Sequence, residues 1–260
     1  MRLFYAEDIK DRQKRYIITG SEARHIYKVL RMKSGDELLL MDQNGNRYRC
    51  VIEDIRHGKV YVLIKEKLLP PPSSPVHITV CISLIRSDPM DLVIQKVSEL
   101  GAEVVQPFYS ERSIVRIAED KIEHRLRHWK EVAKNAAKQC GRPKPIQVLP
   151  PILLKELLAQ DWEEDLLRLF LWEQERETSI KDVLRSTEKV DKIVGVIGPE
   201  GGFTLEEARL LKEKGFISVS MGGRILRAET AAIAFVALCQ YEFGDLGLSY
   251  DMKASSPVRP

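Results

Sequence analysis

The sequence predicts two domains of mixed α/β class, a small β-barrel with one helix followed by a larger domain built on a parallel sheet. Residues 1–69 contain short β-like segments separated by turns, whereas residues 76–247 alternate between strand-like and helix-like segments. The run PPPSSP at 70–75 separates them, and its prolines lack the N–H that a sheet ladder needs, so we expect an extended linker there. We therefore expect domains at 1–72 and 76–247 and a flexible tail at 248–260.

The composition is that of a globular protein with reduced cysteines. The 260 residues are 44% hydrophobic and 30% charged, which excludes wholesale disorder. No apolar run approaches the roughly 18 residues of a transmembrane helix, and the first residues lack the apolar segment of a secretory signal. The four cysteines, Cys50, Cys81, Cys140 and Cys239, form no C-x-x-C pair. We expect a cytoplasmic protein with no metal site and no membrane partner.

The first domain owes its predicted barrel to three strand-like segments. We expect strands at 37–41, 47–55 and 59–65, separated by the turn sequences DQNGN and HG. Several short strands and one helix in about 70 residues are typical of a small barrel.

One helix interrupts these strands, and we expect it at 21–31. Ser21 is a suitable N-cap, because its hydroxyl can accept a hydrogen bond from the first turn. Ile26, Val29 and Leu30 recur at helical spacing and should form the apolar face.

The second domain alternates strands and helices. We expect strands at 77–83, 104–109, 167–172, 192–197 and 217–221, and helices at 89–100, 119–140, 205–214 and 229–243. Buried strands that alternate with helices imply a mostly parallel sheet covered on both faces.

A glycine-rich loop, IGPEGGF at 197–203, follows one of these strands. Thr204 should cap the next helix, and Glu207 would complete a capping box with it. Ligands of open α/β sheets bind beyond the carboxyl ends of strands, where glycines allow close approach of the backbone. An ordinary glycine turn would give the same pattern.

A second loop of this kind, GGRILRAETA at 222–231, lies between a strand and an otherwise apolar helix. Its two arginines and Glu229 exceed what helix capping needs. Together the two loops predict one site at adjacent strand ends. The sequence contains no G-x-G-x-x-G, P-loop, H-E-x-x-H or G-x-S-x-G motif.

Positive charge is concentrated in two stretches. Residues 1–69 hold fifteen Lys and Arg against ten acids, or +5, and residues 121–145 hold eight against two, or +6. Each alone would fit a solvated surface, but two of them flanking a linker favour a polyanionic partner.

The loops IGPEGG and GGRILRAETA resemble those of the SPOUT superfamily of knotted methyltransferases. Further segments look like the bacterial family that methylates N3 of a uridine in 16S ribosomal RNA. They are His25 with VLRM before Gly35, QK at 95–96 with ELG at 99–101, SER at 110–112, QCGR at 139–142 and FGDLG at 243–247. The resemblance covers about residues 2–247.

This resemblance implies an N-terminal PUA-like β-barrel plus a C-terminal SPOUT α/β domain with a deep trefoil knot. It implies S-adenosylmethionine (S-adenosyl-L-methionine) as methyl donor, 16S ribosomal RNA within the small ribosomal subunit as partner, and a homodimer whose sites are completed by the partner subunit. The cofactor positions carried over are Leu171, Trp172, Glu173, Ile197, Gly198, Pro199, Glu200, Gly201, Gly202, Met221, Gly222, Gly223, Ile225, Leu226, Arg227, Thr230 and Ala231.

The chain departs from the family pattern at three positions. Gly223 occupies a position often held by proline, and Asn135 and Lys138 stand where many members carry acids. We therefore assign no catalytic base to that helix.

Methyl transfer to uridine N3 requires loss of the imide proton, so the site needs a base or a cation that stabilises the anion. Arg227 could stabilise charge on the uracil oxygens, and Glu229 or Glu200 could accept the proton. Equally, Glu229 could only hold Arg227 in place. N3 lies on the Watson–Crick edge, so the target uridine must be unpaired.

The predicted RNA contacts lie mainly in the first domain. Arg24, Lys28 and Arg31 recur at i, i+4 and i+7 and should share one helical face. The full predicted set is Arg24, His25, Lys28, Arg31, Arg112 and Arg142.

Two alternatives remain open. One is a SPOUT enzyme that acts on transfer RNA or on another ribosomal site, against which the segment 25–32 argues. The other is a catalytically silent RNA-binding protein of ribosome assembly, against which the two intact loops argue.

Overall fold

The computed structural model describes residues 2–6, 9–10, 13–42, 44–68 and 74–248. The chain forms two compact units. Of the described residues, the first comprises those up to 68 together with 137–144, and the second comprises 74–136 and 145–248. Most of the predicted linker and tail lies outside the described residues: only residues 74 and 75 of the linker and residue 248 of the tail are described.

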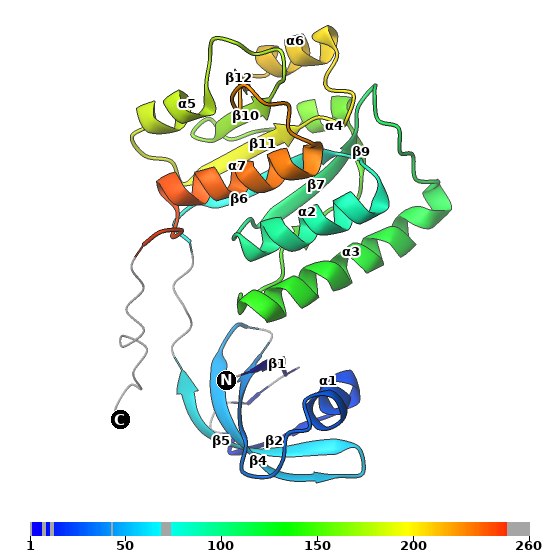
Figure 1. Ribbon diagram of the computed structural model, residues 1–260, viewed down its shortest axis with the longest axis vertical. Coiled ribbons are helices and arrows are strands. Elements are labelled where there is room, and N and C mark those ends of the chain that lie inside the picture. The colour runs from blue at the N-terminus through cyan, green and yellow to red at the C-terminus, as the bar shows by residue number, and fades with distance from the viewer. Residues whose placement is uncertain (1, 7–8, 11–12, 43, 69–73, 249–260) are drawn as a thin grey trace. The chain divides into compact units, whose positions relative to one another are not determined.

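The first unit is a curled five-stranded sheet (Figure 1). The strand order is β1-β3-β4-β5-β2, with β1 parallel to β3 and the other pairs antiparallel. The strands are β1 (Leu3–Tyr5), β2 (Arg15–Ile18), β3 (Glu37–Met41), β4 (Arg47–Arg56) and β5 (Lys59–Leu68). The three predicted strands are confirmed, two of them with longer bounds. β1 and β2 were not predicted, because three or four residues are too few to show alternation.

The helix of this unit differs from the prediction. α1 (Gly20–Arg24) continues directly as a π-helical turn, η1 (His25–Val29). Thr19 is the N-cap, and its side chain makes no cap hydrogen bond. The prediction of Ser21 as N-cap is therefore wrong, because the helix begins one residue earlier and includes Ser21.

The π-turn also changes which side chains face the core. The N–H of Leu30 donates to the carbonyl of His25 at 2.9 Å, five residues back, which widens the turn. Ile26 is fully buried and Leu30 packs on the core, as predicted, but Val29 is 67% exposed. The predicted apolar face fails at Val29 because its spacing assumed a regular α-helix.

The second unit is a seven-stranded sheet in which all strand pairs are parallel. The order is β12-β10-β11-β6-β7-β8, and β9 pairs with β7. Its strands are β6 (His77–Ser83), β7 (Val104–Tyr109), β8 (Gln147–Val148), β9 (Ile152–Leu153), β10 (Leu167–Leu171), β11 (Lys192–Ile197) and β12 (Ile217–Val219).

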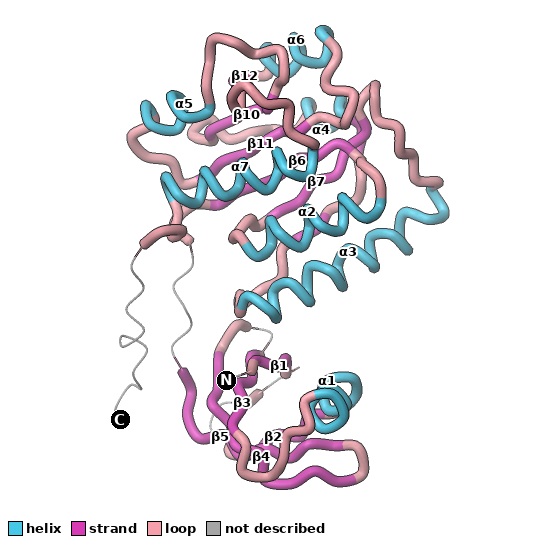
Figure 2. Tube along the Cα trace, viewed as in Figure 1, coloured by secondary structure: helices cyan, strands magenta, loops and turns pink. Residues whose placement is uncertain are grey.

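Helices cover both faces of this sheet, as predicted (Figure 2). One core joins it to α2 (Ser87–Glu99), α3 (Glu119–Cys140), α5 (Ile180–Ser186) and α7 (Ala228–Phe243). The other joins it to α4 (Leu154–Leu158) and α6 (Leu205–Glu213). The mixed α/β class is confirmed, whereas the trefoil knot stays a prediction.

The packing of α7 on the sheet is tight at Gly195 of β11. A Cβ at this position would lie 2.3 Å from the ring of Phe235 on α7. Phe235 is fully buried, so its ring fills the space that Gly195 leaves. The first residues of α7, Ala228 and Ala231, are thereby held above the end of the sheet.

All nine elements predicted for the second unit are confirmed, four of them with the predicted bounds: 77–83, 104–109, 192–197 and 119–140. The strand predicted at 217–221 ends at Val219, because the chain turns there into a loop. The short elements β8, β9, α4 and α5 were not predicted.

The C-terminal turn of α3 groups with the first unit, which was not predicted. Lys138 forms an ion pair with Glu22 and lies 5.3 Å from the centre of the Tyr5 ring. The Tyr5 hydroxyl donates to the carbonyl of Arg142 at 3.4 Å, and burial raises the pKa of Tyr5 to about 12. These contacts anchor residues 137–144 in the first unit.

Candidate active site

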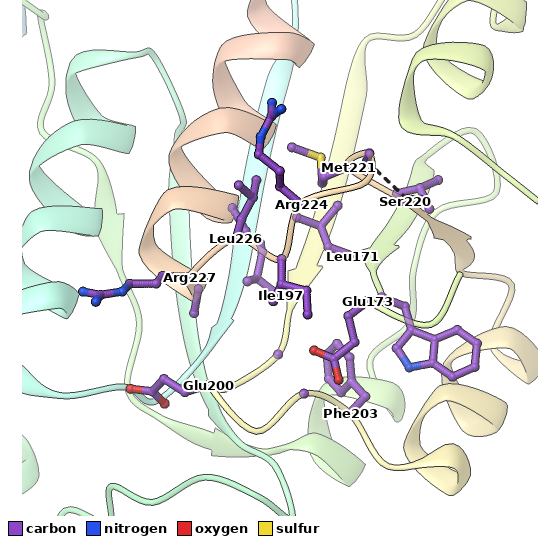
Figure 3. Close-up of a pocket in the computed structure, with 18 of the residues that line it drawn as sticks. Leu171, Glu173, Ile197, Glu200, Phe203, Ser220, Met221, Arg224, Leu226 and Arg227 are labelled. Carbon is purple, nitrogen blue, oxygen red and sulfur yellow. Dashed lines mark hydrogen bonds between the residues drawn. The ribbon is translucent and has the colours of Figure 1, made fainter. Parts of the chain in front are cut away.

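A pocket of about 360 Å³ lies at the carboxyl ends of β10, β11 and β12 (Figure 3). Three loops surround it, at 172–179, 198–203 and 220–227, and the first turn of α7 closes one side. The lining combines apolar side chains with a small number of charged ones. This is the place where a parallel sheet offers a ligand site.

The pocket brings together nearly all of the predicted cofactor positions. Every one of them lines it except Gly201 and Thr230. The lining residues that sequence reasoning missed are Arg176, Phe203, Val219, Ser220, Arg224 and Ala228. Most of these adjoin a predicted position and could have been found by extending the motifs by one or two residues. Arg176 carried no such signal.

Gly202 is the glycine that the first loop requires. Its φ is +67°, and its N–H donates to the carbonyl of Pro199 at 2.9 Å, which closes a tight turn. A Cβ at Gly202 would lie 2.5 Å from a carboxylate oxygen of Glu173 on the neighbouring loop. The two loops therefore approach closely at Gly202, where the positive φ favours glycine and an added Cβ would displace the Glu173 carboxylate.

The predicted capping box is present at the start of α6. Thr204 Oγ1 accepts from the N–H of Glu207 at 3.2 Å, and Glu207 Oε2 accepts from the N–H of Thr204 at 2.9 Å. The buried Glu207 does more than was predicted, because its Oε1 also accepts from the N–H of Glu111 at 2.8 Å. One carboxylate thus joins the turn after β7 to the end of the glycine loop.

Arg112 lies in this same turn and supports the loop directly. Its Nη1 donates to the carbonyl of Gly201 at 3.0 Å. Beneath it the hydroxyl of Ser83 lies 3.1 Å from that of Ser110 and 2.7 Å from that of Ser113, and all three serines are buried. Arg112, predicted as an RNA contact, therefore also holds the backbone of the predicted cofactor loop.

The structure separates the three catalytic candidates. Arg227 and Glu200 both line the pocket and extend toward the same side of Figure 3. Glu229 lies in the first turn of α7 and is not among the lining residues. Within the described part of the chain, no hydrogen bond or ion pair joins Glu229 to Arg227.

Arg24, Lys28 and Arg31 are exposed, but they do not share one helical face, and Arg142, also predicted as an RNA contact, is half-buried. Arg24 and Lys28 lie on α1 and η1, whereas Arg31 lies beyond the helix with a left-handed φ of 53°. The predicted common face is wrong for this reason. His25 is also exposed and contacts the Phe4 ring edge-on, with centroids 6.1 Å apart.

Two kinds of site are not found in the described ranges. No group of three or more His, Cys, Asp or Glu side chains there is arranged to hold a metal ion. Likewise, none of the described helices combines the length and the apolar character needed to cross a membrane.

A parallel α/β sheet with a pocket of glycine-rich loops at its carboxyl edge, joined to a curled β unit, defines a two-domain protein that binds a small molecule beyond its strand ends. Residues 72–240 match the RNA methyltransferase domain, and residues 18–65 match the RNA methyltransferase PUA domain. The chain belongs to this RNA methyltransferase family.

Relatives of known name are similar in sequence to this chain over most of its length. Ribosomal RNA small subunit methyltransferase E of Bacillus subtilis is 30% identical over 87% of this chain and 90% of its own length. The protein of the same name from Aquifex aeolicus is 30% identical over 92% of this chain and 98% of its own length.

Solved structures give the same result. The Neisseria gonorrhoeae ribosomal RNA small subunit methyltransferase E, bound to S-adenosyl methionine, has a TM-score of 0.83 at 30% identity, covering 95% of this chain and 99% of that one. A Legionella pneumophila methyltransferase in complex with the same cofactor has a TM-score of 0.83 at 30% identity, covering 94% of this chain and 98% of that one.

Proposed function

We propose that this chain methylates small-subunit ribosomal RNA with S-adenosylmethionine as donor, and that the target is N3 of a uridine in the 16S molecule. The observation that carries the proposal is the pocket itself, in which two sequence motifs distant from each other and the loop after β10 line one cavity. The relatives named above support the substrate class.

The pocket fits such a cofactor on its own dimensions and chemistry. A volume of about 360 Å³ lies in the range of small-molecule sites. The cavity offers apolar walls at Leu171, Ile197 and Leu226, and open backbone at Gly222 and Gly223. These residues would hold the nucleoside and amino-acid parts of the cofactor.

When bound, the cofactor supplies an electrophilic methyl group, and the residues of this chain prepare the nucleotide that receives it. The Arg227 guanidinium would stabilise negative charge on the uracil oxygens as the N3 proton leaves. Glu200 is the better candidate for proton acceptor, because it lines the pocket and Glu229 does not. Holding the base in line with the methyl group would supply much of the rate.

The remaining parts of the proposal concern the partners. The first domain, 1–72, would dock the RNA through exposed cations on and after α1, and the second, 76–247, would carry out catalysis. A homodimer, a trefoil knot in the second domain and a cytoplasmic location complete the proposal. The dimer and the knot follow from the resemblance, and the location follows from the composition and the cysteine pattern.

Three measurements test this proposal. Calorimetry with S-adenosylmethionine should show one site per chain, and a protein that gives no heat would be the silent assembly factor instead. Small subunits from a strain lacking the gene should accept labelled methyl groups from the purified protein. Primer extension should then stop at one uridine, since N3 methylation blocks the pairing edge. If the label enters transfer RNA instead, the chain is a methyltransferase that acts on transfer RNA.

A further inference from the structure

The loop between β10 and α5 contains a buried carboxylate that the proposed chemistry does not use. Glu175 is only 8% exposed. Its Oε1 accepts from three successive backbone N–H groups, at 3.0 Å from Arg176, 3.0 Å from Glu177 and 3.2 Å from Thr178. This one oxygen therefore fixes the turn of residues 175–178.

The other oxygen of Glu175 ties that turn to the rest of the unit. Oε2 accepts from the hydroxyl of Ser218 on β12 and lies 3.8 Å from Nζ of Lys212 on α6. The Lys212 ammonium in turn lies 5.1 Å from the centre of the Trp172 ring. The carboxylate thus joins this loop to α6 and β12, two consecutive elements that come much later in the chain.

The charge of Glu175 is well stabilised. Hydrogen bonds from Ser218 and from the backbone N–H groups of Glu177 and Thr178 lower the pKa of its carboxyl to about 2. The group is therefore ionised at neutral pH, and hydrogen bonds to an ionised acceptor are the stronger kind.

The loop that Glu175 fixes forms one wall of the pocket. Trp172 and Arg176 line the pocket, but Glu175 itself does not. The N–H of Trp172 donates to Val219 at 3.1 Å, and the N–H of Ser220 donates to Thr178 at 2.8 Å, so this wall and the loop after β12 share a backbone ladder.

We propose that Glu175 is a positioning residue for the cofactor, which acts by holding Trp172 and Arg176 in the pocket wall through the turn 175–178 and its tie to Ser218. This inference rests on the proposed function, since it assigns Glu175 a part in the same site. It predicts that loss of the carboxylate weakens cofactor binding more than it slows the reaction at saturation.

The test compares Glu175→Gln with Glu177→Gln as a matched control. Glu177 is an exposed carboxylate of the same loop and does not line the pocket, so the control removes the same charge. The glutamine at 175 keeps the shape but loses the negative charge. Its oxygen can still face the three backbone N–H groups, but these bonds are then to a neutral acceptor, and Ser218 must accept from the NH₂ group instead of donating. We expect Glu175→Gln to raise the cofactor Kd by about tenfold or more, with kcat at saturating cofactor within about threefold of wild type. In Glu177→Gln, the cofactor Kd and kcat should each stay within about twofold of the wild-type value.

Amide hydrogen exchange without cofactor gives a second readout. The N–H groups of residues 176–178 should exchange faster in Glu175→Gln than in wild type and in Glu177→Gln. Wild-type cofactor affinity in Glu175→Gln would overturn the inference, whether or not exchange is faster. A loss confined to kcat would overturn it as well.

Ser218→Ala provides a milder variant should Glu175→Gln fail to fold. It keeps the carboxylate and its three backbone bonds and removes only the tie to β12. We expect an intermediate rise of about threefold in cofactor Kd, and an unchanged Kd would overturn the inference. If wild type and Glu177→Gln bind no S-adenosylmethionine at all, it is the proposed function that fails.

Discussion

Replacing Gly202 with alanine tests whether the contact between two loops sets cofactor affinity. The backbone at Gly202 has a φ of +67°, in the left-handed region, where a side chain costs about 1–2 kcal/mol. The added Cβ would also lie 2.5 Å from Glu173 Oε1, but that oxygen ends a flexible, exposed side chain that can move away. Backbone strain should therefore dominate.

The strain predicts the size of the effect. If the loop relaxes out of its left-handed turn in the free protein, binding must restore it, and about 1–2 kcal/mol corresponds to roughly five- to thirty-fold weaker binding. Calorimetry with S-adenosylmethionine or its demethylated product measures this loss, and urea unfolding measures the accompanying change in stability.

Gly20→Ala is the matched control for this variant. Gly20 has nearly the same φ, +66°, nothing lies within 4 Å of its added Cβ, and it belongs to the first unit. It should lose about 1 kcal/mol of stability and keep the wild-type cofactor Kd. A Gly202→Ala protein that binds cofactor as tightly as Gly20→Ala does would refute the reasoning.

Four further outcomes are expected. The carboxyl of Glu175 has a pKa of about 2 in the folded protein against an ordinary 4.5, so its contribution to stability is complete above pH 4.5 and is lost as the pH falls toward 2. Urea unfolding at several pH values should show that the free energy of unfolding of wild type exceeds that of Glu175→Gln above pH 4.5, and that this excess disappears as the pH falls toward 2. An excess that does not change with pH would contradict the lowered pKa of Glu175. Gly222→Val places a β-branched residue at a φ of +105° and should abolish cofactor binding in a folded protein, which calorimetry and circular dichroism check together. Neutralising Arg24, Lys28 and Arg31 should reduce the slope of log affinity for RNA against log salt by about 2, because up to three phosphate contacts are lost; filter binding with an unchanged slope would exclude them as docking residues. Sedimentation at micromolar concentration should give a dimer, and a monomer would remove the proposed dimer.

The glycine loops could be predicted because their signal is local. Each follows an apolar run that ends in glycines, and the parallel order of β10, β11 and β12 brings such ends to one edge. Thr204 and Glu207 are three residues apart, so their capping box is also visible in the sequence.

Glu175 shows what local patterns miss. It stands in the polar segment EQERET, where an acid is expected to face solvent. Its burial depends on backbone N–H groups that only the folded loop presents, and on Ser218, 43 residues away. No periodicity or motif links the two positions.

The helix of the first unit shows a different limit. The stripe that includes Val29 follows α-helical spacing in the sequence, but the π-turn at His25–Val29 inserts an extra residue into the turn. In this turn Ile26 is buried and Val29 is exposed, a difference that α-helical spacing in the sequence does not predict.

The fit of Phe235 into the space above Gly195 has a consequence for how variants of this chain should be interpreted. Gly195 lies in the middle of β11, and its substitution would displace α7, whose first residues Ala228 and Ala231 line the pocket. A genetic screen for lost methylation would therefore recover changes at Gly195 beside those in the loops. Substitution at this strand position should therefore reduce methylation, although Gly195 is not among the residues that line the pocket.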